Sequence, residues 1–189
     1  MRTQARAHGD MTTELARACA ALCRGSNFFA AWLWSSDTDA VRAPSLTSEH
    51  RSKVIANGLR ELDRFLNILI DEVSLGHSLP ARPGQRNTAN KLRNLRDALG
   101  LPHEDHERLL ALGRSRECLF HCGGMVSRGD NRQARALTLG WSKGEGAGRA
   151  LTRVPVGSAI VVSRADIESV CHFYRKLAED LASPFGLLP

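Results

Sequence analysis

The fold is decided by residues 54–73, which read VIANGLRELDRFLNILIDEV. Their apolar side chains recur at steps of three and four residues, the spacing that places side chains on one face of an α-helix. This apolar face consists of Val54, Ile55, Leu59, Leu62, Phe65, Leu66, Leu69, Ile70 and Val73. We therefore expect a principal core helix that begins near Ser48 and ends at Gly76.

Two segments of different character precede this helix. The first ten residues, MRTQARAHGD, are polar, and we expect them to be flexible. A short helix should then begin at Thr12 or Thr13 and end at Gly25, because glycine commonly terminates helices. Residues 28–34, FFAAWLW, form the most aromatic stretch, which is typical of a core or a subunit interface, although aromatic rings also stack on nucleic-acid bases.

Three helices should follow the core helix. The first covers about residues 88–99 and is closed by a glycine. The second covers residues 103–122, HEDHERLLALGRSRECLFHC, with acidic residues at its start, where they complement the helix dipole, and two glycines after its end. The last helix has the clearest beginning, since Ser163 followed three residues later by Asp166 approximates a capping box.

A β-hairpin is expected before the last helix. Residues 135–162 contain short segments rich in Thr, Val, Leu and Ile, broken by SKGEGAG and PVG. We interpret GEGAG at residues 144–148 as a hairpin turn, because a phosphate-binding loop would lead into a helix and none follows here. The whole pattern predicts one mainly α domain over residues 1–189, an antiparallel helical bundle with a small β-hairpin insertion before the C-terminal helix.

The charge of the chain bears on its partners. It has 26 Lys and Arg against 20 Asp and Glu, a formal net charge of +6, which favours an anionic partner such as RNA or DNA. The basic residues are mostly arginines, scattered along the sequence without a concentrated run. A mildly basic surface therefore explains this composition as well as a phosphate-binding face does.

The cysteines and the hydropathy indicate a compartment. The five cysteines are odd in number and no charged and apolar leader precedes them, which is typical of a reducing cytoplasm. The longest apolar stretches are far shorter than the ~18 residues that indicate a membrane span. We expect a cytoplasmic protein that is not inserted in a membrane.

Residues 116–124, RECLFHCGG, are the part of the sequence most typical of an active site. Cleavage of RNA without a metal needs a group that moves a proton near neutral pH and a cation that stabilises the charge developing on the phosphate. His121 and Arg116 meet these two needs. When a ribose 2′-hydroxyl attacks its own phosphodiester, His121 would act as general base or acid and Arg116 would stabilise the transition state.

Helical geometry separates these two residues. On a regular helix Arg116 and His121 lie about 140° apart around the axis and ~7.5 Å along it, so they do not share a face. Arg114, Glu117 and His121 do share one, because steps of three and four align side chains in a row. We expect Glu117 to orient the imidazole and Arg114 to balance the local charge. Arg116 would join them through a distorted helix end near Gly123 or, in the arrangement that we favour, through a second copy of the chain.

The string RECLFHCGGMV resembles the Arg-x4-6-His motif of the HEPN superfamily, in which an arginine and a polar residue precede a histidine near a helix end. Arg116, Glu117 and His121 match this motif with four intervening residues, and Arg114 satisfies the looser spacing. Glu117 stands where many active members have Asn, Asp or His. The order of elements from Ser48 to Leu181 is also similar to that of some members.

This resemblance implies a helical protein that dimerises through its motif helices and carries Arg116, His121, Glu117 and Arg114 at its catalytic site. It implies neither a metal nor a cofactor. HEPN proteins include metal-independent endoribonucleases of toxin–antitoxin, anti-phage and RNA-processing systems. We therefore expect a homodimer that acts on RNA, with an antitoxin or a nucleotidyltransferase as a further partner.

Three other interpretations stay open. The chain is also consistent with a catalytically inactive HEPN-like module that binds RNA or a protein. In a structural interaction domain, His121 would only complement the helix dipole and Arg116 would pair with a surface carboxylate. A metal site would draw its ligands from Cys118, His121 and Cys122, with a fourth from Cys19 or Cys23.

Overall fold

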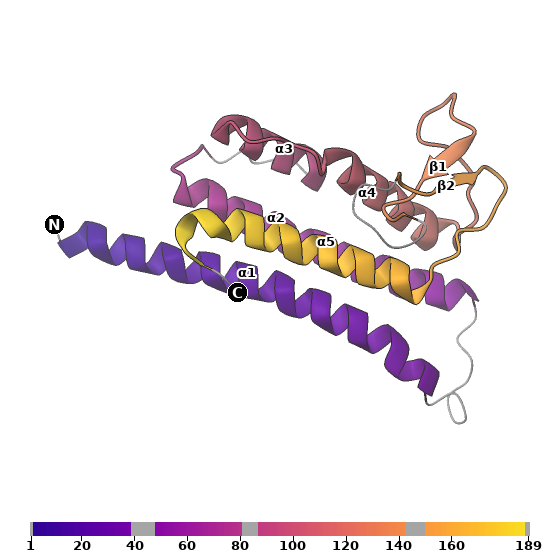
Figure 1. Cartoon of the computed structure of the whole chain (residues 1–189), viewed down its shortest axis with the longest axis horizontal. Coiled ribbons are helices and arrows are strands. Elements are labelled where there is room, and N and C mark those ends of the chain that lie inside the picture. The colour runs from indigo at the N-terminus through magenta and orange to yellow at the C-terminus, as the bar shows by residue number, and fades with distance from the viewer. Residues whose placement is uncertain (1, 39–47, 81–86, 143–149, 188–189) are drawn as a thin grey trace.

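Helices make up most of the computed structural model, which describes residues 2–38, 48–80, 87–142 and 150–187. They lie alongside one another, and a short strand pair sits beside one end of them (Figure 1). The elements in chain order are α1 Arg2–Thr38, α2 Ser48–Gly76, α3 Thr88–Leu99, α4 His106–His121, β1 Ala136–Thr138, β2 Arg153–Pro155, α5 Arg164–Ala182 and the 3-10 turn η1 Ser183–Phe185. The prediction of a mainly α fold with a small hairpin before the C-terminal helix is confirmed.

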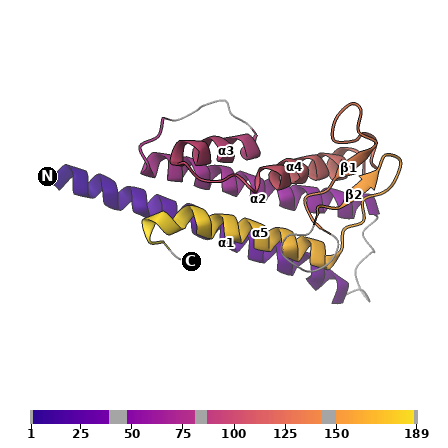
Figure 2. The same cartoon turned by 45° about the horizontal axis from the view of Figure 1, so that its top comes forward.

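Helix α2 lies at the centre of the bundle, as its long apolar face predicts. It contacts α1, α3, α4 and α5. Figures 1 and 2 show α1 and α5 on one side of α2, and α3 followed by α4 running back along its other side. The buried apolar side chains of α2 are Ile55, Ala56, Leu59, Leu62, Leu66, Leu69, Ile70 and Val73. Each large aliphatic side chain among them stabilises the fold by about 1.5–3 kcal/mol through burial.

Helix α1 is longer than predicted, and the prediction that it ends at Gly25 is wrong. It continues through Gly25 to Thr38. This glycine does not terminate the helix but allows α2 to approach α1 closely. A Cβ atom at Gly25 would lie 2.9 Å from Cε2 of Phe65 on α2. Conversely, a Cβ atom at Gly58 on α2 would lie 2.1 Å from Cε2 of Phe29 on α1. Each helix thus offers a glycine to a phenylalanine of the other.

The same helix begins at Arg2, not at Thr12 or Thr13 as predicted, and so includes residues 2–10. Their backbone is therefore helical in the structure. The expectation that residues 1–10 are flexible stays a prediction.

The ends of α3 and the beginning of α5 agree with the sequence, whereas α4 begins at His106, three residues later than predicted. The side chain of Asn87 caps α3 by accepting a hydrogen bond from the backbone N–H of Asn90 at 3.1 Å, and Gly100 closes that helix with φ 67°. At the start of α5, Ser163 and Asp166 form both bonds of the predicted capping box. These caps fix where the chain enters α3 and α5.

The strand pair packs on α4. Strands β1 and β2 are antiparallel, with Leu137 opposite Val154. Just after β1, Gly140 lies against Leu112 of α4, and its N–H donates to Oγ of Ser115 at 3.2 Å. The observed strands fall inside the predicted hairpin region 135–162, whereas GEGAG at 144–148 lies outside the described residues. The hairpin therefore covers one flank of the motif helix.

No described helix has a run that is long and apolar enough to cross a lipid bilayer.

Candidate active site at the end of helix α4

The motif helix α4 ends sharply at His121. The N–H of Cys122 donates to the carbonyl oxygen of Cys118 at 3.0 Å, and the next two residues have positive φ, 58° at Gly123 and 89° at Gly124. This left-handed backbone favours glycine and turns the chain back on itself. The Gly124 carbonyl then accepts from the N–H of Ile160 at 2.8 Å, which ties the turn to the segment that leads into α5. The predicted end of the motif helix at its two glycines is confirmed.

Arg116 points from α4 toward α2. Its Nη1 donates to Oδ2 of Asp63 at 3.1 Å, and the two side chains are 27% and 26% exposed, so the ion pair is partly shielded from solvent. Burial raises the pKa of the neighbouring Tyr174 well above its usual value, while the Asp63 carboxylate raises it further and Arg116 lowers it. The buried phenol of α5 thus lies within the field of the ion pair. Asp63 holds the guanidinium on the α2 side of the motif helix.

Arg116, Glu117 and His121 line one depression of about 400 Å³ between α2 and α4. Asn57 and Arg60 of α2 complete its polar lining. Helix α4 is regular up to His121, so no distortion of the helix end is needed to bring the arginine and the histidine to one cavity. The Cα–Cβ bonds of Arg116 and His121 leave the helix about 140° apart. Both side chains nevertheless line the same cavity, because α2 packs beside α4 and forms its other wall.

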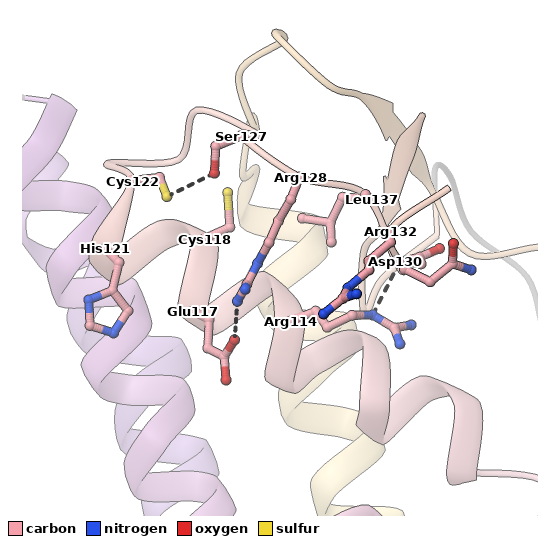
Figure 3. A pocket seen from close by; sticks show the side chains of 12 residues that line it. Arg114, Glu117, Cys118, His121, Cys122, Ser127, Arg128, Asp130, Arg132 and Leu137 are labelled. Carbon is pink, nitrogen blue, oxygen red and sulfur yellow. Dashed lines mark hydrogen bonds and ion pairs between the residues drawn. The ribbon is translucent and has the colours of Figure 1, made fainter. Parts of the chain in front are cut away.

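A second hollow of about 630 Å³ opens on the other side of Glu117 and His121, beneath the loop that follows the two glycines (Figure 3). Glu117 and His121 line both hollows and form the ridge between them. The charged and histidine side chains around this second hollow are Arg114, Glu117, His121, Arg128, Asp130 and Arg132.

The Glu117 carboxylate has a partner other than the predicted one. The sequence predicts that Glu117 orients His121, but in the structure its Oε2 accepts a hydrogen bond from Nη2 of Arg128 at 3.1 Å (Figure 3). Nε of Arg114 lies 3.1 Å from Oδ1 of Asp130. Figure 3 shows the His121 ring pointing away from the Arg114 and Asp130 side chains. The ring packs edge-on against Phe120, with centroids 5.0 Å apart.

Asp130 anchors the loop over the second hollow. Its Oδ1 accepts from the backbone N–H of Thr138 at 2.8 Å and its Oδ2 from the Thr138 hydroxyl at 2.5 Å. Burial alone would raise the pKa of Asp130, but the bonds from Thr138 and the charges of Arg114 and Arg153 hold it below its usual value. The carboxylate is therefore ionised at neutral pH and joins α4, the loop and β1. Arg114 belongs to this joint, and the expectation that it takes part in catalysis stays a prediction.

The residues that the sequence did not single out come from outside the motif. Asp63 lies on the flank of the core helix, and a carboxylate bordering an apolar face is a weak signal for a partly buried cation partner. Arg60 lies three residues earlier on the same helix. Nothing in the sequence distinguishes Arg128 from the other scattered arginines, because its role depends on the turn at the two glycines.

The described residues do not supply the ligands that a metal site at Cys118, His121 and Cys122 would need. The described residues contain no group of three or more His, Cys, Asp and Glu side chains arranged to hold a metal ion. The Cys118 thiol donates to the carbonyl oxygen of Met125 at 3.4 Å, whereas the Cys19 thiol packs against α5, 3.8 Å from the carbonyl oxygen of Ala178. Burial raises the pKa of both thiols to about 11, so they stay protonated and apolar in character.

Comparisons with protein-family models, with curated proteins and with solved structures find no match to this chain.

Proposed function

We propose that this chain is a HEPN-like, metal-independent endoribonuclease in which His121 moves protons and Arg116 stabilises the charge on the phosphate. The observation that carries this proposal is the depression between α2 and α4, which Arg116, Glu117 and His121 line together. Its volume of about 400 Å³ is at the lower end of the range of small-ligand sites, enough for one nucleotide phosphate and its ribose. The RNA strand would lie across the end of the motif helix.

The proposed reaction needs no group beyond those of the chain. The 2′-oxygen of a ribose attacks the adjacent phosphorus as His121 takes its proton, and the bond from phosphorus to the 5′-oxygen of the next nucleotide breaks. The departing 5′-oxygen receives that proton back from the imidazolium of His121, so the histidine is neutral again and the products carry a 2′,3′-cyclic phosphate and a 5′-hydroxyl. Arg116 faces the extra negative charge on the phosphate oxygens, where a positioned cation acts most strongly. Asp63 keeps the guanidinium in place before the substrate arrives.

We further propose that the protein acts as a homodimer in the cytoplasm, with an antitoxin or a nucleotidyltransferase as a further partner in toxin–antitoxin or anti-phage defence. Large apolar side chains are exposed near the end of the motif helix: Phe120 is 37% exposed, Met125 50% and Val161 79%. Met125 pairs through its backbone with Ala159, which brings the segment of Val161 beside it. Exposed apolar side chains gathered in one region favour a protein contact there.

One alternative function has a specific observation in its favour. Because Glu117 is paired with Arg128, the described structure gives His121 no carboxylate partner to orient its ring. This arrangement favours a catalytically inactive module that binds RNA through the arginines that line the two hollows. Such a module would bind RNA and leave it intact.

The chemistry of the products tests the proposal. Wild-type protein incubated with single-stranded RNA in excess chelator should yield fragments with 2′,3′-cyclic phosphate and 5′-hydroxyl ends, identified by mass spectrometry. The same RNA with 2′-O-methyl riboses should stay intact, because its nucleophile is blocked. Fragments with 5′-phosphate ends, or cleavage of the methylated RNA, would rule out the proposed reaction. Intact RNA in both samples would favour the catalytically inactive RNA-binding module instead.

A further inference from the structure

The second hollow holds two arginines that the proposed reaction does not use. Arg128 and Arg132 come from the loop that follows Gly124, and both line the hollow of about 630 Å³ beside the ridge of Glu117 and His121. Ser127 and Asn131 of the same loop add neutral polar groups to its lining. The hollow is thus built almost entirely from one loop and one face of α4 (Figure 3).

The charged side chains around this hollow form ion pairs that differ in how exposed they are. Asp130 accepts hydrogen bonds from Thr138 and pairs with Arg114, so the ion pair of Arg114 and Asp130 stabilises the folded loop. The pair between Arg128 and Glu117 is much more open, with side chains 80% and 50% exposed. Such exposed pairs contribute little stability, and a phosphate readily replaces the carboxylate.

Arg132 is the more available of the two loop arginines. It is exposed, and it forms no ion pair with any residue in the described part of the chain. Together the two loop arginines place two exposed guanidinium groups in the lining of the hollow. Guanidinium groups bind phosphates in two-point contacts and also stack on unpaired bases.

We propose that this second hollow binds the backbone phosphate of the nucleotide next to the scissile bond of a single-stranded RNA, through Arg128 and Arg132. The inference rests on the proposed function, because Glu117 and His121 border both hollows and a strand at His121 passes directly from one into the other. A phosphate bound by Arg128 releases Glu117. The carboxylate then faces the imidazole four residues along the same helix face, where it can orient the ring.

Binding of an uncleavable RNA tests the inference. The probe is a fluorescein-labelled single-stranded RNA of about 12 nucleotides with 2′-O-methyl riboses throughout, and fluorescence anisotropy measures its Kd for the full chain. Arg128→Ala and Arg132→Ala should each weaken binding about five- to tenfold, with a larger loss in the double variant. The slope of log K against log salt should fall by about 0.7 for each phosphate contact removed.

Arg135→Ala is the matched control. Arg135 is an exposed arginine just after the same loop, but it does not line the hollow, so its removal should change Kd less than about twofold. If the double variant bound RNA as tightly as wild type while wild type cleaved unmodified RNA, the second hollow would be excluded and the ribonuclease proposal would stand. If binding depended on Arg128 and Arg132 but wild type cleaved nothing, the hollow would stand and the catalytic proposal would fail. Equal affinity for a duplex of the same sequence would contradict the preference for a single strand.

Discussion

At the scale of single residues, the ion pair between Arg116 and Asp63 places the guanidinium at the candidate site. The guanidinium could not be placed from the sequence, since helical spacing alone separates Arg116 from His121. Its partner lies 53 residues earlier in the chain, and only the packing of α2 on α4 brings the two together. The end of the motif helix was predictable because it depends on local sequence. The partners of Glu117 and Arg114 were not, because they lie in a loop whose course depends on the turn at Gly123 and Gly124.

Asp63→Asn tests the positioning role of that carboxylate. The variant keeps the shape of the side chain but removes the charge that holds Arg116, so we expect the rate of RNA cleavage at saturating substrate to fall about 10- to 100-fold with a smaller change in KM. Single-turnover kinetics with labelled RNA measure both quantities. Restoration of the rate by Asp63→Glu would support positioning, whereas an unchanged rate in Asp63→Asn would contradict it.

At the scale of elements, the contact between α1 and α2 sets the frame on which the site is built. The core face of α2 and the caps of α3 and α5 were predictable, because they rest on periodicity and on side-chain to backbone bonds within a few residues. The length of α1 was not. In the sequence, Gly25 predicts a helix end. Only the packing of Phe65 against it in the structure shows that it makes a contact between helices.

Gly58→Ala tests this contact. The added methyl group would collide with the ring of Phe29, so we expect the free energy of unfolding to fall by about 1–3 kcal/mol. Gly113→Ala on α4 is the matched control, because nothing lies within 4 Å of the added atom. There alanine should raise the free energy of unfolding by roughly 0.5–1 kcal/mol, since it favours the helix more than glycine does. Chemical denaturation measures both changes, and a Gly58→Ala variant as stable as wild type would contradict the close packing of the two helices.

At the scale of the whole molecule, the described structure brings Arg116 and His121 to one hollow within a single chain. A second chain is therefore not required to assemble these two residues. In the proposed homodimer, the partner would instead cover the exposed apolar side chains beside the motif helix and enclose the RNA.

Light scattering tests the homodimer. We expect wild type at micromolar concentration to have the mass of two chains, and the double variant Phe120→Ser, Met125→Ser to have the mass of one, because it loses apolar contacts at the proposed interface. Leu75→Ser is the control, since Leu75 is 54% exposed near the opposite end of α2. A monomeric wild type, or a double variant that stays dimeric, would contradict the proposed interface.

The central claim is that Arg116 and His121 together cleave RNA, and the rate of cleavage in chelator tests it most directly. Wild type should be compared with Arg116→Ala and His121→Ala, and with Arg135→Ala and His172→Ala as controls, because these two exposed residues line neither hollow. The account predicts that wild type and both controls cleave single-stranded RNA at similar rates, and that each site variant loses activity by a factor of about 10² to 10⁴. Cleavage at the wild-type rate by both site variants would contradict it.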